Sequence, residues 1–548
     1  MSSNFRVRPF VEEISTLRSV MRTMLMKTLQ MGDHFVKCHV EWHLFTSWME
    51  NAFTNVMRTL DRKESDLYFQ KFNPGLNVDQ VVGLIIKNEM LEKTINRMVS
   101  QALESTDLGK HLKDLGRSRI YLTKSLQESQ KNNLTAALDH INKAILLAPF
   151  PAEGVDHQSK SQLAFCFMTR ARLLRKLGHY QGCELDLAEA LQHPVENNGK
   201  VSYLEKIAEE IASLTAVGAS YAPPNSALNV VRKFFNVDAV NDRVHGAAQH
   251  IYLSYNEVVG RTLITKKEVK PQMTIIAEEP FCAWLAPFHY NKYCSFCLSP
   301  LEQHFFPCRK CSLVRYCSSN CEEECWKSYH SIECKFMPIL RNLGAGHFAL
   351  RCIITAGVDK SLATLRASLS STENQNKTKP CKSFQNDYRD IFTLMARDNE
   401  AAVMPKMAFL STFLAYLGKS MDLIGESSIH HLAALIYRQL GIGYLNSFFI
   451  SDHGFSQVER GETIDIREIG MGLYASASLL SHACDPNCDK LFVSNKILIV
   501  AKRALKEGEE ITISYGPLKE VHPYAKRQEM LETTHSFKCV CDPCSKRE

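Results

Sequence analysis

The sequence predicts an α+β protein of several domains, in which a helical amino-terminal region precedes a β-rich carboxy-terminal region. Length is the first reason: the chain has 548 residues, whereas one hydrophobic core rarely grows beyond about 250–300 residues. Second, apolar residues recur at helical spacing between residues 136 and 191, and β-type runs such as residues 273–277 follow later. Third, cysteines gather in pairs over residues 294–334 and again near the end of the chain.

Composition and charge limit the classes of function. Hydrophobic residues make up 45% of the chain and charged residues 23%, which is the balance of a soluble globular protein. The formal net charge is +6 and no basic stripe accompanies it, so we expect no direct nucleic-acid binding. The sequence shows neither a signal peptide nor an apolar run of about 18 residues. We therefore expect an intracellular protein without a membrane partner.

The amino-terminal part divides into two helical blocks. Residues 1–110 contain apolar stretches that suit helices but no motif, so we assign them no role. In residues 111–225, small and apolar residues recur at helical spacing over 136–149 and again over 164–194, with the segment 149–160 between the copies. The copies resemble tetratricopeptide (TPR) repeats, although any antiparallel helical hairpin shows small residues at its close approaches. The expected role of this block is a docking surface for a chaperone or another partner.

Eight possible metal ligands lie between residues 294 and 334. They form four pairs with two or three residues between the partners: Cys294 and Cys297, Cys308 and Cys311, Cys317 and Cys321, and His330 and Cys334. Zinc favours thiolate and imidazole in closed tetrahedral sites, so eight ligands suffice for two zinc ions. The paired spacing and a reducing compartment count against disulfides or a chance scatter. A short segment with little apolar content would gain its fold largely from such metal binding.

This segment resembles the MYND zinc finger. The resemblance rests on the order of the pairs, on the run Arg-Tyr-Cys-Ser at 315–318, and on Trp326 near its end. It implies interleaved sites, with one zinc on Cys294, Cys297, Cys317 and Cys321 and the other on Cys308, Cys311, His330 and Cys334. Cys325 is then left over, either as a substitute ligand or as a spectator thiol. The resemblance also implies a module that binds proline-rich peptides or corepressors.

Three further segments resemble the SET domain and its tail. Residues 470–488, which contain the run Ser-His-Ala-Cys at 481–484, are similar to the first SET signature, and residues 508–516 are similar to the second. The pattern Cys-x-Cys-x2-Cys at 539–544 is similar to a post-SET zinc cluster. A MYND finger inside a SET domain, with helical repeats before it, is the arrangement of the SET and MYND domain-containing (SMYD) family, in its repeat-bearing branch.

The resemblance divides the carboxy-terminal part into five segments. These are a first SET segment at 245–293, the MYND finger at 294–334, a helical SET insertion at 335–445, the SET core at 446–517 and the post-SET tail at 518–548. A linker is expected at 221–224. The polar run 368–380 is expected to be a mobile insertion without a function.

The resemblance implies a protein-lysine N-methyltransferase that uses S-adenosylmethionine on histone or non-histone proteins. It further implies a role in transcriptional regulation, in the cytoplasm and nucleus. Methyl transfer of this kind is an in-line displacement by a neutral amine, whereas lysine has a reference pKa of about 10.4. Tyr515, at the end of the second signature, is the candidate catalytic hydroxyl. A core tyrosine that ends a strand is the alternative.

The same resemblance indicates the residues that would hold the cofactor and a third metal. The expected cofactor-binding residues are Val259, Gly260, Arg261, Asn446, Ser481, His482, Tyr515 and Phe537. The resemblance implies that Cys484 joins Cys539, Cys541 and Cys544 around this metal. The tail supplies only three cysteines and structural zinc is four-coordinate, so a fourth ligand from elsewhere is expected. About three Zn²⁺ ions per chain would follow.

Three residues depart from the pattern of the family. Thr262 stands where the opening loop usually has its second glycine, and it brings a β-branched side chain. Ser481 stands in place of asparagine and has fewer donors, and His535 stands in place of a tyrosine. The alternative function is therefore a catalytically weak or inactive adaptor. Such an adaptor would assemble corepressor (histone deacetylase) or chaperone complexes.

Overall fold

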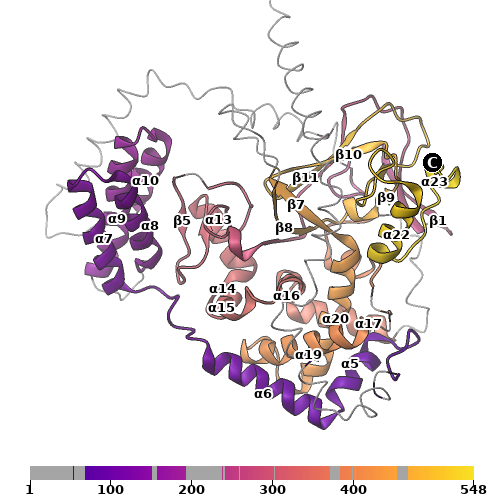
Figure 1. Cartoon of the computed structure of the whole chain (residues 1–548), viewed down its shortest axis with the longest axis horizontal. Coiled ribbons are helices and arrows are strands. Elements are labelled where there is room, and N and C mark those ends of the chain that lie inside the picture. The colour runs from indigo at the N-terminus through magenta and orange to yellow at the C-terminus, as the bar shows by residue number, and fades with distance from the viewer. Residues whose placement is uncertain are drawn as a thin grey trace, which may run out of the picture.

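The computed structural model describes Phe53, Thr54, Tyr68 and residues 70–150, 157–192, 237, 241–257, 260–301, 303–370, 383–397, 399–400, 403–452 and 467–548. Val259, the expected linker at 221–224 and all but the first three residues of the polar run 368–380 lie outside these ranges. The α+β architecture is confirmed. Helices form the first part of the chain, and small sheets together with further helices form the rest (Figure 1).

Four helices form two successive antiparallel hairpins. These are α7 (Leu115–Gln130), α8 (Leu134–Leu147), α9 (His157–Lys176) and α10 (Tyr180–Gln192), and each contacts the next. Small buried residues such as Ala137, Ala144 and Ala171 lie at their close approaches. Helix α9 begins at His157, so the last residues of the expected connection 149–160 are helical. The predicted helices are confirmed, while their assignment to TPR repeats stays a prediction.

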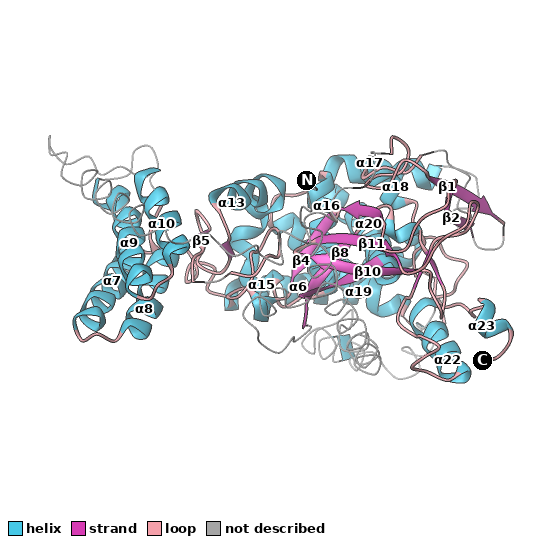
Figure 2. Cartoon of the chain, turned by 90° about the horizontal axis from the view of Figure 1, so that it is seen from above, coloured by secondary structure: helices cyan, strands magenta, loops and turns pink. Residues whose placement is uncertain are grey.

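These hairpins dock onto the cysteine-rich segment, which lies beside them in both views (Figures 1 and 2). The guanidinium of Arg170 is fully buried and donates to both carboxylate oxygens of Asp186, at 2.8 and 2.7 Å, and to the Phe305 carbonyl at 2.7 Å. The Phe167 ring stacks on Phe306 with centroids 6.0 Å apart. A buried charge is tolerated only with such partners, so the Arg170 contacts define one docking geometry.

A second helical layer includes residues close to the amino terminus. Helices α5 (Val78–Ile86) and α6 (Glu89–Ser105) pack against α19 (Met404–Ser420), and α5 also packs against α20 (Ile429–Asn446). A capping box at Asn77 and Gln80 fixes the start of α5. Residues 78–105, which have no motif, therefore help to hold α20, and α20 ends at the candidate site.

The remaining helices are short or cover this layer. They are α13 (Ser319–Cys325), α14 (Ser331–Glu333), α15 (Met337–Leu340), α16 (Ala345–Ala356), α17 (Val358–Ser370), α18 (Tyr388–Phe392), α22 (Tyr524–His535) and α23 (Asp542–Ser545). Within the described residues, no helix combines the length and the apolar character needed to cross a bilayer.

The strands form several small sheets rather than one large sheet. One has the order β4 (Cys282–Leu285), β8 (Arg467–Leu473), β7 (Ser447–Asp452), and another the order β10 (Cys488–Val493), β11 (Lys496–Ala501), β3 (Thr274–Glu278). Three pairs complete the set: β1 (Ile251–Asn256) with β2 (Gly260–Thr265), β5 (Phe306–Pro307) with β6 (Arg315–Tyr316), and β9 (Ser481–His482) with β12 (Thr512–Ile513). The β9–β12 pair is parallel and joins the two sequence signatures.

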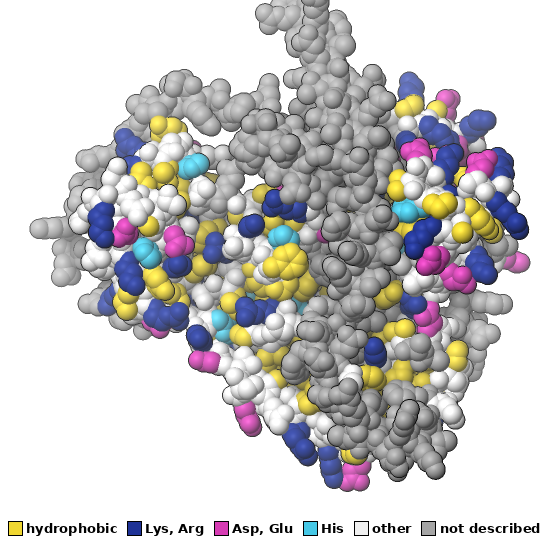
Figure 3. All heavy atoms as spheres, in the orientation of Figure 1, with side chains coloured by type: hydrophobic (Ala, Val, Ile, Leu, Met, Phe, Trp, Pro, Cys, Tyr) yellow, Lys and Arg dark blue, Asp and Glu magenta, His cyan; other side chains and the backbone are white. Residues whose placement is uncertain are grey.

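The described surface carries charges of both signs. On the face drawn in Figure 3, lysine and arginine side chains alternate with aspartate and glutamate over the carboxy-terminal lobe at the right. This mixture has no single sign that would favour a polyanion.

Candidate zinc clusters and active site

The structure gathers the cysteine-rich segment into two groups of four. Cys294, Cys297, Cys317 and Cys321 form one group, and Cys308, Cys311, His330 and Cys334 form the other, with all ligand atoms of a group within 4.8 Å of one another. Four thiolates around zinc, with Zn–S near 2.3 Å, lie about 3.8 Å apart. The Sγ separations of Cys297–Cys317 and Cys308–Cys334 are 3.6 and 3.9 Å. Both groups therefore fit tetrahedral zinc, and they are the two sets that the resemblance implied.

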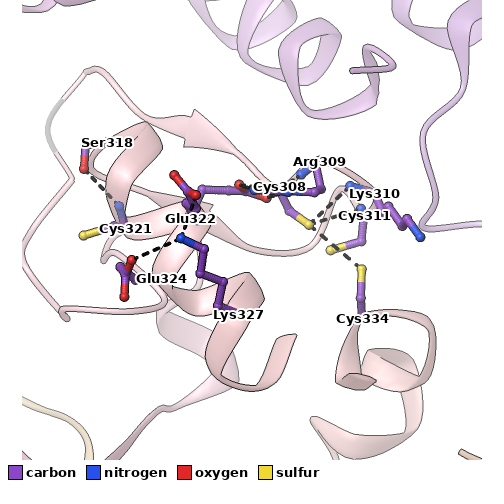
Figure 4. A network of polar contacts seen from close by, with 11 residues as sticks. Cys308, Arg309, Lys310, Cys311, Ser318, Cys321, Glu322, Glu324, Lys327 and Cys334 are labelled. Atoms are coloured by element: carbon purple, nitrogen blue, oxygen red, sulfur yellow. Dashed lines mark hydrogen bonds and ion pairs between the residues drawn. The ribbon is translucent and has the colours of Figure 1, made fainter. Parts of the chain in front are cut away.

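Backbone turns and hydrogen bonds orient the ligand side chains of the second group. Figure 4 shows Cys308 and Cys311 of one turn pointing toward Cys334, which lies on another segment. The backbone N–H groups of Lys310 and Cys311 donate to the Cys308 sulfur at 3.4 and 3.5 Å, which stabilises a thiolate. His330 ends a single π-helical turn, and its Nε2 lies 3.5 Å from the Cys311 sulfur. Such a turn places one side chain off the α-helical face.

Cys325 takes part in neither group. It is fully buried at the end of α13, and burial raises the pKa of its thiol to about 12. Its sulfur belongs to none of the four-ligand groups of the described residues. Its position fits the spectator alternative.

A third group joins the SET core to the tail. Cys484, Cys539, Cys541 and Cys544 bring their sulfurs within 4.8 Å of one another, and those of Cys484 and Cys544 are 3.5 Å apart. The N–H of Cys484 donates to the Cys541 sulfur at 3.4 Å. Cys484 is distant in sequence from the other three, so this cluster fixes the tail against β9.

Metal analysis of protein purified without chelator should find about three zinc ions per chain, because the described residues contain three four-ligand groups. Inductively coupled plasma mass spectrometry on the intact chain measures this directly. A ratio near one would contradict the assignment of at least two groups.

The two signatures meet at His482. Strand β12 pairs with β9 so that Ile513 lies opposite His482. The Nδ1 atom of His482 accepts from the Tyr515 N–H at 3.1 Å, so Nε2 carries the ring proton and faces the Cys484 sulfur at 3.3 Å. Both ring nitrogens are therefore occupied inside the protein. The His482 ring positions Tyr515 and the third cluster, and any contact with a cofactor would come from its backbone.

Tyr515 lies among aromatic side chains from the tail. Its hydroxyl donates to the Leu480 carbonyl at 2.5 Å, and burial raises the pKa of the phenol above its usual value. The His535 ring stacks on Tyr515 with centroids 4.9 Å apart and planes 29° apart. Phe537 meets the same ring edge-on at 6.4 Å. The phenol thus stays protonated and can act only as a hydrogen-bonding group.

A cavity opens next to Tyr515. Its lining is mostly apolar or aromatic and comprises Leu445, Asn446, Ser447, Phe448, Phe449, Ala477, Ser478, Leu480, Lys490, Tyr515 and His535. The Ser447 hydroxyl is buried and has no hydrogen-bond partner among the described residues. The amide nitrogen of Asn446 donates to the Met395 and Ile442 carbonyls at 2.7 and 2.8 Å. A buried hydroxyl without a partner is costly, so Ser447 is suited to bind a polar group of a ligand.

Two of the departures from the family pattern meet at one carboxylate. The hydroxyls of Thr262 and Ser481 lie 3.1 Å apart, and both donate to Oε1 of Glu510. Gly260, at the start of β2, has φ +79°, a conformation that favours glycine. The Arg261 guanidinium donates to the Thr393 hydroxyl and carbonyl at 2.7 and 2.6 Å, so its side chain braces a neighbouring loop.

Sequence reasoning gave no role to three of these residues. Ser447 and Lys490 line the cavity, and Glu510 accepts from the hydroxyls of Thr262 and Ser481. The only sequence signal for a role of Lys490 is its place between Asp489 and the apolar residues Leu491 and Phe492. This pattern does not show which way the lysine side chain faces.

Comparison with known proteins agrees with this geometry. Residues 253–516 match the SET domain family. Protein-lysine N-methyltransferase SMYD4 of Mus musculus is 23% identical over 514 residues, covering 72% of this chain and 64% of that protein. Histone-lysine N-methyltransferase SMYD3 of Homo sapiens is 24% identical, covering 53% and 60%. A SET and MYND domain-containing protein of Dictyostelium discoideum is 26% identical, covering 54% and 59%.

The matched segment and the paired signatures define a SET-domain protein. Its cysteine groups and its relatives extend that conclusion. The chain carries a SET domain and is similar to proteins of the SMYD family over most of its length. It spans slightly less than two thirds of the mouse relative, at 64% of that protein's length.

Proposed function

We propose that the chain is an S-adenosylmethionine-dependent protein-lysine N-methyltransferase. The observation that carries the proposal is the β9–β12 pairing, which places Tyr515 over the cavity with Phe537 and His535 around it. The names of the SMYD4 and SMYD3 relatives support the same reaction. Bound S-adenosylmethionine would supply an activated methyl group on sulfur.

The residues present fit such a cofactor and an acceptor amine. Ser447 offers a buried hydroxyl, and Gly260 lets the backbone approach closely. The apolar and aromatic residues of the lining would lower the pKa of an amine that enters, because desolvation disfavours its charged form. The Tyr515 hydroxyl, held by the Leu480 carbonyl, would orient that amine. We propose Gly260, Asn446, Ser481, His482 and Phe537 as the surrounding cofactor-binding residues, with Arg261 through its backbone.

Calorimetric titration with S-adenosylmethionine tests the binding step before any substrate is known. We expect saturable binding at one site per chain, and weaker binding by Ser447→Ala, because the cavity loses its buried hydroxyl donor. Ser411→Ala is a matched control, since Ser411 is a buried serine of α19 that bonds only within its own helix. Absence of binding up to about 1 mM ligand would reject the methyltransferase proposal.

The inactive adaptor is the second candidate function, and the hydrogen-bonded cluster of Thr262, Ser481 and Glu510 favours it. Thr262 and Ser481 fill the edge of the site with hydroxyls that already have an internal acceptor. In this alternative, the finger would bind proline-rich peptides or corepressors, and helices α7 to α10 would bind a chaperone or another partner. Under either candidate function, we propose a role in transcriptional regulation and a location in the nucleus and cytoplasm.

Restoring the usual residues separates the two candidates. We expect native protein to transfer methyl groups to some cellular protein, and Ser481→Asn combined with His535→Tyr to raise that rate by about tenfold, because an amide and a phenol add hydrogen-bond donors at the site. Tritium transfer from labelled S-adenosylmethionine into a cell extract measures it. Activity in the double variant alone would identify the native chain as an adaptor.

A further inference from the structure

The cavity beside Tyr515 contains an amine of the chain itself. Among the described residues that line it, Lys490 is the only lysine or arginine. It lies on β10, opposite Ile499 of β11, and its side chain is only partly exposed. The rest of the lining consists of apolar, aromatic and uncharged polar side chains, so desolvating the lysine charge there costs free energy.

The contacts of Lys490 direct its amine toward the proposed catalytic group. Its Nζ donates to the Ser514 carbonyl at 3.2 Å, and Ser514 directly precedes Tyr515 in the chain. The same Nζ lies 5.7 Å from the centre of the Phe448 ring, another wall of the cavity. The amine is therefore held next to the residues that would orient a substrate lysine.

The environment also makes this amine unusually reactive. Burial lowers the pKa of Lys490 to about 8, and the negative charge of Glu468 opposes that shift. At pH 7, about one tenth of such amines are neutral, whereas an ordinary lysine with a pKa near 10.4 has only about 0.04% in the neutral form. The neutral amine is the nucleophile in methyl transfer. Lys490 therefore offers a larger fraction of reactive amine at pH 7 than an exposed lysine does.

Resting on the proposed function, we propose that Lys490 is a methyl acceptor of the chain's own reaction, in which its amine occupies the acceptor cavity. The lone pair of neutral Nζ forms a bond to the methyl carbon while the bond from that carbon to sulfur breaks. Nζ becomes a methylammonium and takes up the positive charge, and S-adenosylhomocysteine leaves as the neutral product. The methylammonium then exchanges its protons with solvent.

Mass spectrometry of the intact, zinc-loaded chain tests this without any external substrate. The protein is incubated with S-adenosylmethionine that carries a deuterated methyl group, digested with chymotrypsin, and the label is located by fragmentation. We expect label on Lys490, with a yield per chain that does not change over about a hundredfold dilution, because a buried acceptor is modified within its own chain. Lys490→Arg should remove the label.

A matched control comes from an exposed lysine near the same site. Lys519 forms an ion pair with Asp485 at 2.7 Å on the surface, and Lys519→Arg should leave the label on Lys490 unchanged. Peptide mapping of the native chain locates the label even if Lys490→Arg fails to fold.

The possible failures separate this inference from the function on which it rests. Label only on other lysines, or a yield that rises with protein concentration, overturns the internal acceptor while methyl transfer itself stands. Unlabelled Lys490 in protein that binds S-adenosylmethionine and methylates an extract protein also overturns it. Absence of S-adenosylmethionine binding overturns both.

Discussion

Tyr515→Phe should lower the rate of methyl transfer by about 100-fold or more, a loss of the size found when one preorganised hydrogen-bonding group is removed from a transition state. The group here is the phenol oxygen as an acceptor for the amine N–H, because its own proton is donated to the Leu480 carbonyl. The structure supports a large effect because the hydroxyl is anchored on the Leu480 carbonyl at 2.5 Å and borders the cavity. Affinity for S-adenosylmethionine should change by less than about twofold, since the ring and its stacking on His535 remain. Single-turnover kinetics and calorimetry measure the two quantities separately.

Tyr68→Phe is the matched control for this variant. Tyr68 is also a buried tyrosine whose hydroxyl donates to a backbone carbonyl, that of Leu84 at 2.6 Å, but it packs in the helical layer. It should lose a similar hydrogen bond, worth about 1 kcal/mol, without a change in rate. An unchanged rate in Tyr515→Phe would mean that Tyr515 is a core tyrosine that ends a strand, the alternative reading of the sequence.

Cys544→Ser should cause the second large effect, at the junction of core and tail. Loss of one ligand from the third group should lower the zinc content from about three to about two ions per chain. The tail carries His535 and Phe537 to the cavity, so affinity for S-adenosylmethionine should fall by about tenfold or more, equal to about 1.4 kcal/mol. Metal analysis and calorimetry on the same preparation measure both.

Two cysteine variants show whether this loss is specific. Cys308→Ser should also remove one zinc but keep S-adenosylmethionine binding, because its group lies in the finger and folds around its own metal. Cys325→Ser changes a buried cysteine outside every group and should keep all three ions. If Cys308→Ser abolished binding in a soluble, folded chain, the finger and the cofactor site would not be separable.

The metal clusters were predictable because their chemistry is local. Pairs such as Cys308 and Cys311 lie within one turn, and the resemblance to the MYND finger implied which pairs share a zinc ion. The signatures were predictable for a similar reason, since Ser481 to Cys484 and the run ending at Tyr515 are short motifs. The structure then pairs the two signatures through β9 and β12, within the residues that match the SET domain family.

The roles of individual side chains were less predictable. His482 and Arg261 were expected to hold a cofactor, yet both ring nitrogens of His482 have partners within the protein, and the Arg261 guanidinium binds Thr393. A motif shows that a residue type is needed at a position, but it does not show with which group the side chain forms its hydrogen bonds. That choice depends on neighbours that are distant in sequence.

The sequence by itself determined the α+β class, the helical hairpins, the three ligand sets and the family, because each depends on spacing within a short segment or on a few ordered motifs. The tertiary structure alone decided what surrounds the cavity. It joined Thr262, Ser481 and Glu510 into one cluster, packed α5 under α20, and turned Lys490 toward Ser514 and Phe448. The physical reason is that side-chain direction and burial arise from contacts between elements far apart in the chain, and these contacts leave no periodic signal in the sequence.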